Sequence, residues 1–208
     1  MKKTLALILA ACMSLSLVAC GGGDKSNTPP AGGSNATSQT GGGSQQPSTG
    51  GGEAKTPPLD AVYAPVAGEA VPISEVSDPT FGEEILGKGI AFRPAEGKVF
   101  APCDASVDLM FDTGHAVSLV ADFGAEILIH VGLDTVNLKG EHFTIHAKTG
   151  DKVKKGDLLI EFDVAAISAA GYDVITPLVI CNTPDYTTVN IHAGQTVAPG
   201  DLVLELGK

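Results

Sequence analysis

The sequence predicts an all-β domain, a sandwich or barrel of two similar halves, that follows a disordered N-terminal segment. Three observations support this prediction. The chain of 208 residues contains short Val-, Ile-, Leu- and Phe-rich runs separated by turn residues. Two short sequence patterns recur within it. Residues 21–58 contain no Val, Leu, Ile or aromatic residue, so the apolar side chains needed for one buried core lie after them.

Residues 1–19 have the three parts of an export signal. Lys2 and Lys3 form a positive start, residues 5–13 are an unbroken apolar run, and "LVAC" ends the segment at Cys20. The tetrad resembles the bacterial lipoprotein box, in which the cysteine thiol is lipidated. We therefore expect a lipoprotein signal peptide and a membrane anchor at Cys20, because nine apolar residues are too few to span a bilayer.

The next segment is rich in Gly, Ser, Thr and Pro. Because it has almost nothing to bury, it cannot offset its own ordering entropy, and we expect it to be a disordered linker. The predicted organisation is therefore a signal peptide at 1–19, a linker at 20–58 and one folded domain at 59–208.

The folded part is predicted to consist mainly of strands. One short helix is expected at Ala165–Ala170, where Gly171 ends it. Apolar runs bounded by turn residues predict strands at 97–102, 107–111, 116–121, 126–131, 157–162, 174–180 and 201–206.

Two internal repeats indicate that the domain has similar halves. "GDKVKKGDLLIE" at 150–161 matches "GQTVAPGDLVLE" at 194–205, with the same Gly, Val and Gly-Asp positions leading into an apolar strand that ends in Glu. "APVAGEAV" at 64–71 matches "APCDASV" at 101–107 more weakly. Repeated turn-and-strand units of this kind predict two similar halves packed against each other.

Charge and cysteine content narrow the class of protein. The net charge of −11 would repel a polyphosphate chain, so we expect no nucleic-acid partner and consider basic protein surfaces more suitable. The four cysteines include no CxxC pair. Cys103 and Cys181 are expected to be small buried apolar residues, and a bridge between them stays open if the domain is exported.

His130 differs from the other four histidines because it lies within an apolar strand. We expect the strand to alternate, and Gly132 to leave open space beside the imidazole. A preceding turn, Thr113-Gly114-His115, offers a second imidazole and a hydroxyl. The core-facing set is expected to be Ile127, Ile129 and Val131, and the opposite set Leu128, His130 and Gly132.

A permanent zinc site within the chain is disfavoured. His142 and His146 are four residues apart, but "FTI" between them is typical of a strand, where this spacing is too wide for easy chelation. Neither an HExxH nor a CxxC motif accompanies them.

"GAEILIHVGLDTV" (124–136) resembles the signature of the glucose-type enzyme IIA (EIIA) family of the bacterial phosphoenolpyruvate-dependent sugar phosphotransferase system. "FDTGHAVSL" (111–119) resembles the family segment that contains the second active-site histidine. "FGEEILGKGIAFRP" (81–94) and residues 138–163 match further blocks of the family, and the resemblance extends from about residue 60 to the end.

The resemblance implies a β-sandwich with duplicated halves and a phosphotransferase component with a phosphohistidine intermediate. His130 would carry the phosphate, His115 would stabilise the phosphate oxygens and Thr113 would orient His115. The domain would accept phosphate from phospho-HPr and pass it to the EIIB domain of a sugar permease, EIIB/EIIC, without an obligatory cofactor.

The resemblance also implies a partner-binding face around the two histidines. Acidic Asp78 and Asp134 would meet basic partner surfaces. His115 and His130 could together bind zinc, but only with a ligand from a partner. The apolar ring implied by position consists of Phe81, Leu86, Phe111, Leu128 and Val136.

Two functional hypotheses follow, and they differ in location. The first is a working phosphocarrier, cytoplasmic as in the family. The second is a lipid-anchored lipoprotein on the outer face of the cell membrane, which reuses the EIIA fold as a non-enzymatic binding module, with or without zinc at the partner interface. The histidine pair supports the first hypothesis, and Cys20 with its leader supports the second.

Overall fold

The computed structural model describes residues 59–208. The predicted signal peptide, the lipidation site at Cys20 and the linker at 20–58 lie outside the described residues and stay predictions. No helix within residues 59–208 is long and apolar enough to cross a membrane.

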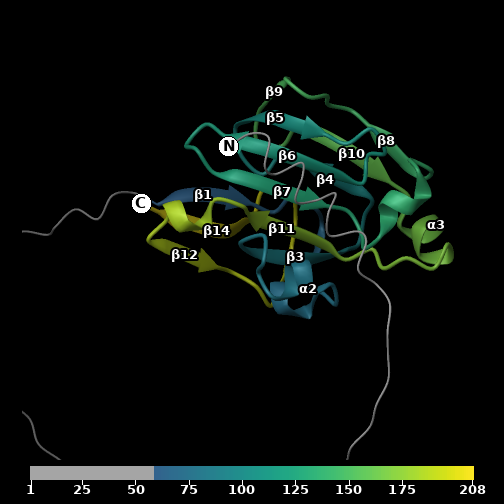
Figure 1. The fold of residues 1–208 in the computed structure, drawn as a ribbon, viewed down its shortest axis with the longest axis horizontal. Helices are drawn as coiled ribbons and strands as arrows, with labels where there is room; N and C mark the ends of the chain where they lie inside the picture. The colour runs from purple at the N-terminus through teal and green to yellow at the C-terminus, as the bar shows by residue number, and fades with distance from the viewer. Residues whose placement is uncertain (1–58) are drawn as a thin grey trace, which may run out of the picture. The chain divides into compact units, whose positions relative to one another are not determined.

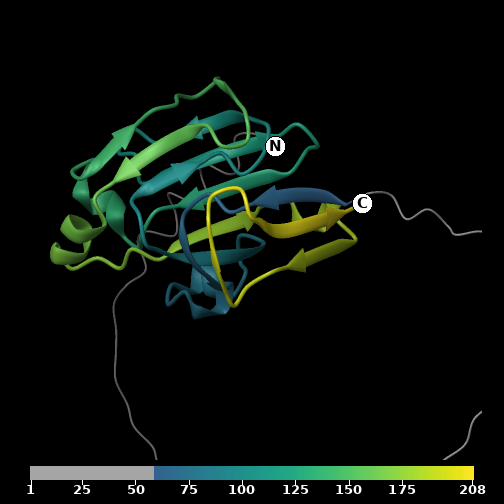
Figure 2. The same cartoon turned by 180° about the vertical axis from the view of Figure 1, so that it is seen from behind.

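The fold is a mainly antiparallel β-sandwich, which confirms the predicted fold class. Figures 1 and 2 show one large sheet and two small sheets that lie over it. The large sheet has the order β13 (Gln195–Val197), β2 (Gly68–Pro72), β3 (Lys88–Pro94), β11 (Thr176–Ile180), β7 (Glu126–His130), β6 (Ala116–Ala121), β5 (Ala105–Met110) and β9 (Lys152–Val153).

The small sheets have three strands each. One is β1 (Asp60–Tyr63), β14 (Leu202–Gly207) and β12 (Thr188–Ile191), and the other is β4 (Lys98–Phe100), β10 (Leu158–Phe162) and β8 (Phe143–Ile145). The short helices are α2 (Pro79–Gly82) and α3 (Val164–Ala169), with 3-10 turns η2 (Ile73–Glu75), η3 (Thr135–Leu138) and η4 (Thr183–Asp185).

The two halves repeat the same backbone geometry, as the internal repeats predict. The outer strands β9 and β13 pair with β5 and β2 in the same way. In the turn that follows β9, the Lys154 N–H donates to the Asp157 carboxylate at 2.7 Å. In the turn after β13, the Ala198 N–H donates to the Asp201 carboxylate at 2.8 Å. The central pair β7 and β11 therefore lies at the junction of the halves.

The core lies between the sheets, and β7 presents alternate residues to it as predicted. Ile127, Ile129 and Val131 are fully buried members of the main core cluster. Leu128 and His130 are buried outside that cluster, on the opposite face of the strand. The strand therefore directs its aliphatic residues to the core and its histidine to a separate site.

The sequence predicted α3 within one residue at each end but missed α2. Helix α2 has four residues, too few for an apolar period, and is started by Pro79 and by Asp78, whose carboxylate accepts from the Thr80 N–H at 2.8 Å. The strands β1, β2, β9, β12 and β13, of two to five residues, were also missed. Strand β3 has seven residues but was not among the predicted strands.

Candidate functional site

The two predicted site histidines lie side by side on neighbouring strands. His130 is the last residue of β7, and it pairs with Ala116 at the start of β6. His115 immediately precedes β6, and its carbonyl accepts from the Val131 N–H at 2.7 Å. The ring centroids are 5.1 Å apart and the ring planes make an angle of 76°. The strand register thus brings together residues 15 positions apart in the sequence.

A backbone hydrogen bond fixes the form of the His130 ring. Its Nδ1 lies 2.7 Å from the Gly132 carbonyl oxygen, which can only accept, so Nδ1 carries the proton and donates. In the neutral imidazole the lone pair is then on Nε2. The ring is only 5% exposed. The orientation of the His130 imidazole is therefore fixed by this hydrogen bond, and its Nε2 carries the lone pair.

Gly132 has a different role from the predicted one. It does not leave open space beside the imidazole, because an added Cβ would lie 2.6 Å from both the Asp173 carbonyl oxygen and Thr135 Cγ2. Its φ of +72° is also in the left-handed region that favours glycine. Gly132 is needed for this close-packed turn, which aims its carbonyl at His130.

His115 is held by the predicted hydroxyl partner. Thr113 Oγ1 lies 2.5 Å from His115 Nδ1, and the side chain of His115 is 1% exposed. Nε2 of His115 is buried and has no hydrogen-bond partner within residues 59–208. A buried polar atom without a partner is unfavourable, so this nitrogen is suited to an incoming group.

Burial keeps both imidazoles neutral. Burial, with a smaller contribution from the neighbouring His130, lowers the pKa of His115 from 6.5 to about 4. Burial also lowers the pKa of His130, against the opposing effects of the Gly132 hydrogen bond and the carboxylates of Asp78 and Asp134. Near neutral pH the site therefore contains two uncharged rings, of which His130 presents a free electron pair.

Two phenylalanines of the predicted apolar ring contact the histidines. The Phe81 ring centroid is 5.4 Å from that of His130, and Phe111 packs edge-on against His115 at 5.0 Å. Phe81 on α2 is 4% exposed, whereas Phe111 is partly exposed. Each imidazole thus has one aromatic ring packed against it.

The other predicted ring residues differ in exposure. Leu86 is 8% exposed and Val136 is partly exposed. Leu128 is only 1% exposed, which argues against the predicted direct contact with a partner because it offers almost no surface. Leu128 instead lies buried within β7, two residues before His130.

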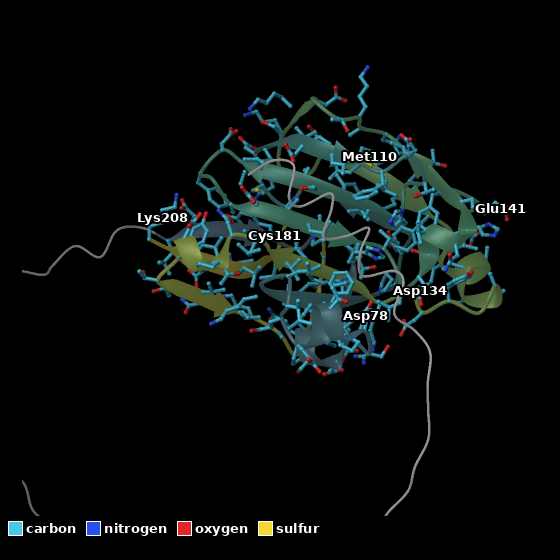
Figure 3. The ribbon with its side chains drawn as sticks, viewed as in Figure 1. Asp78, Met110, Asp134, Glu141, Cys181 and Lys208 are labelled. Carbon is cyan, nitrogen blue, oxygen red and sulfur yellow. The ribbon has the colours of Figure 1, made fainter. Side chains whose placement is uncertain are left out.

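The two acidic residues lie close enough to His130 for their charges to raise its pKa. Figure 3 shows Asp78 and Asp134 on one side of the domain, well separated from Lys208 and Cys181. Asp134 is exposed and has a left-handed backbone with φ of 58°, and the partly exposed Asp78 caps α2. Their position allows them to face a basic partner.

Residues 59–208 contain no cluster of three or more His, Cys, Asp and Glu placed to hold a metal ion. His146 and His192 contact Glu161 and Glu205 at 2.7 and 3.0 Å. His115 and His130 supply only two imidazoles, and a zinc ion shared with a partner at these residues stays a prediction. Both described cysteines are free, Cys103 buried and Cys181 half-buried, so the structure contains no Cys103–Cys181 bridge.

Sequence reasoning missed two residues that shape the site. Thr135 is fully buried in the turn after β7, and its only signal was its position in "GLDTV". Asp173 contributes through its backbone, since its carbonyl accepts from the Leu133 N–H at 2.9 Å. No side-chain pattern could have revealed a residue that acts through its main chain.

Comparisons with known proteins agree with this geometry. The family model "phosphoenolpyruvate-dependent sugar phosphotransferase system, EIIA 1" matches residues 60–186. The glucose permease IIA of Mycoplasma capricolum has a similar structure, with a TM-score of 0.67 and 31% identity over 71% of this chain and 95% of that one.

Two curated relatives differ in how much of their length is matched. The glucose-specific EIIA component of Oceanobacillus iheyensis is 47% identical over 146 residues, 70% of this chain and 88% of that protein. The β-glucoside-specific EIIBCA component of Dickeya chrysanthemi is 49% identical over 138 residues, 66% of this chain but only 22% of that protein. The chain belongs to the EIIA type 1 family of the phosphoenolpyruvate-dependent sugar phosphotransferase system.

Proposed function

We propose that the protein is a phosphocarrier that accepts a phosphoryl group on Nε2 of His130. One observation carries the proposal: His130 Nδ1 is bonded to Gly132 O at 2.7 Å, which leaves the Nε2 lone pair beside a second neutral imidazole. A neutral imidazole nitrogen is a good nucleophile toward phosphorus. The new Nε2–P bond forms as the phosphorus–nitrogen bond of a phosphohistidine donor breaks, and the donor ring keeps the released electron pair.

His115 would stabilise the transferred group. If the Thr113 hydroxyl donates to His115 Nδ1 across their 2.5 Å contact, His115 carries its proton on Nε2, the buried nitrogen without a partner. That N–H would donate to a phosphoryl oxygen. Phosphoryl transfer depends mainly on positioning and on stabilising charge on these oxygens, so a fixed donor in a water-poor site suits it.

The donor and acceptor are expected to be proteins. HPr is the proposed donor, as in the family, and the EIIB domain of a sugar permease is the proposed acceptor. One of the named relatives supports the EIIB assignment, since it is a β-glucoside-specific EIIBCA component. Asp78 and Asp134 beside the site suit partners with basic docking surfaces.

The test is to incubate the purified chain with phosphoenolpyruvate, enzyme I and HPr and to measure acid-labile phosphate. We expect one phosphate on His130 and none in His130→Gln. His192→Gln serves as a matched control, because it removes an imidazole that contacts Glu205 outside the site. Failure of the wild-type chain to accept phosphate would refute the proposal.

The location of this domain is a separate proposal. We propose that the leader directs lipidation of Cys20 and holds the domain at the outer face of the membrane, as "LVAC" indicates. HPr and phosphoenolpyruvate are cytosolic, so an exported domain would serve instead as a binding module. A zinc ion shared with a partner would bind His130 Nε2 and, in the tautomer where His115 Nδ1 donates to the Thr113 hydroxyl, His115 Nε2.

Protease treatment of intact cells distinguishes the two locations. An exported domain is digested before lysis, and Cys20→Ser releases it from the membrane fraction. A domain that survives until lysis is inside the cell, which would refute export and leave the phosphocarrier proposal in place. Equilibrium dialysis of zinc with the purified chain, alone and in the presence of a carboxylate such as acetate, measures what the two imidazoles bind without and with an added carboxylate ligand, and His115→Gln removes one nitrogen.

A further inference from the structure

We propose that Thr135 is a positioning residue that holds the Gly132 carbonyl against His130 and so decides which ring nitrogen is the nucleophile. The inference rests on the proposed function, in which Nε2 of His130 receives the phosphoryl group. It concerns a side chain that contacts neither the imidazoles nor any reacting atom.

The first step is the turn itself. Thr135 Oγ1 donates to the Val131 carbonyl oxygen at 2.5 Å, which closes a five-residue loop directly after His130. Thr135 is 0% exposed. Its Cγ2 packs so closely on Gly132 that an added Cβ there would lie 2.6 Å from it. One β-branched side chain therefore fixes the loop through its hydroxyl and its methyl.

The second step is the far side of the loop. The Leu133 N–H donates to the Asp173 carbonyl at 2.9 Å, and the Asp173 carboxylate accepts from the Ile175 N–H at 2.8 Å. Asp173 lies in the segment before β11 and holds the loop through this main-chain hydrogen bond. Thr135 is thus the side-chain anchor of a loop whose other anchor is main chain.

The third step connects the loop to the chemistry. The Gly132 carbonyl accepts the His130 Nδ1 proton at 2.7 Å, and the partner of one ring nitrogen sets the tautomer of the ring. Without the Thr135 hydroxyl, the buried Val131 carbonyl loses a hydrogen bond and the adjoining peptide turns to regain one. The Gly132 carbonyl would then move, and His130 would also populate the form with its proton on Nε2, which cannot attack.

Thr135→Val removes the hydroxyl and keeps the shape, whereas Thr135→Ser keeps the hydroxyl. The matched control is Thr183→Val, since the Thr183 hydroxyl donates to the Ile180 carbonyl at 2.5 Å and also accepts from the Lys88 N–H at 2.9 Å. Ile180 pairs with Ile127, at the end of β7 away from His130. The control therefore loses two hydrogen bonds outside the site, one more than Thr135→Val loses.

Two measurements on the full chain test the inference. The ¹⁵N chemical shifts of the unphosphorylated His130 ring report the tautomer, and rapid-quench kinetics report phosphate acceptance from phospho-HPr. We expect a single Nδ1–H tautomer in the wild type, in Thr135→Ser and in Thr183→Val. Thr135→Val should show a mixture of tautomers and about tenfold slower acceptance, with the change in kcat and not in KM.

Each outcome decides the inference. A single Nδ1–H tautomer in Thr135→Val refutes it, whatever that variant's stability. A mixture in Thr183→Val as well as in Thr135→Val also refutes it, because general loosening would then be the cause. If the wild type accepts no phosphate, the proposed function fails, but the tautomers of the same variants still decide whether Thr135 sets the His130 ring.

Discussion

Replacing His115 with Gln should make the stability of the domain less sensitive to acid. In the wild type, burial lowers the pKa of His115 to about 4 from its ordinary 6.5. Gln has similar reach and can bond to the Thr113 hydroxyl, but it does not titrate between pH 4 and pH 8. The difference in stability between the wild type and His115→Gln therefore reports the titration of His115 alone.

The sign follows from which state binds the proton. Between pH 6.5 and pH 4 the unfolded chain protonates His115 and the folded chain does not, so the free energy of unfolding falls as the pH falls through this window. Above pH 6.5 the contribution is fully present. For these two pKa values, the loss between pH 7.5 and pH 4.5 is about 2.5 kcal/mol for His115 alone.

Urea unfolding followed by far-UV circular dichroism measures the effect, because the chain contains no Trp. We expect the wild type to lose about 2.5 kcal/mol more than His115→Gln between the two pH values. Carboxylate and His130 titrations affect both proteins and largely cancel in the difference. A difference below about 0.5 kcal/mol would refute the reasoning, because His115 would then not be held neutral by burial.

Three further predictions concern Gly132, the two equivalent aspartates Asp157 and Asp201, and the two cysteines of the folded domain. Gly132→Ala should lower the free energy of unfolding by at least about 2 kcal/mol in urea titrations and slow phosphate acceptance, because a side chain is strained at φ of +72° and would crowd Asp173 O; an unchanged midpoint would contradict this. Asp157→Ala and Asp201→Ala should each lower the free energy of unfolding by about 1 kcal/mol in the same assay, because each removes the acceptor of one backbone N–H in its turn. Cys103 and Cys181 should be alkylated by iodoacetamide at pH 8 at least about a hundredfold more slowly in the folded chain than in urea, since burial raises the pKa of both thiols to about 12; fast labelling, read by peptide mass spectrometry, would contradict it.

The strands that carry the site could be predicted because their apolar residues alternate. Ile127 and Ile129 are needed by the core, so the alternation of the strand by itself puts His130 on the other face. The repeats likewise identified the two halves, because each turn needs the same Gly and Asp. In both cases local chemistry determined the structure directly.

The remaining features depend on contacts between distant segments. Gly132 was predicted to leave an opening, but Asp173, 41 positions later, fills that space. Neither Thr135 nor the short helix α2 belongs to a run of apolar residues with strand or helix periodicity, so the sequence pattern did not predict them. The burial of Leu128 depends on what packs against its face of the sheet, which alternation alone does not specify.

The pairing of the first and last described strands has a consequence for how this domain joins other chains. Asp60 pairs with Leu206, and the Lys208 ammonium donates to the Phe123 carbonyl at 3.1 Å, just before β7 begins. His130 lies at the other end of that strand, about 13 Å along it. Covalent connections made beside Asp60 or Lys208 therefore leave at the end remote from the histidines. A domain built in this way can be attached to unrelated segments while its reactive end still meets other proteins.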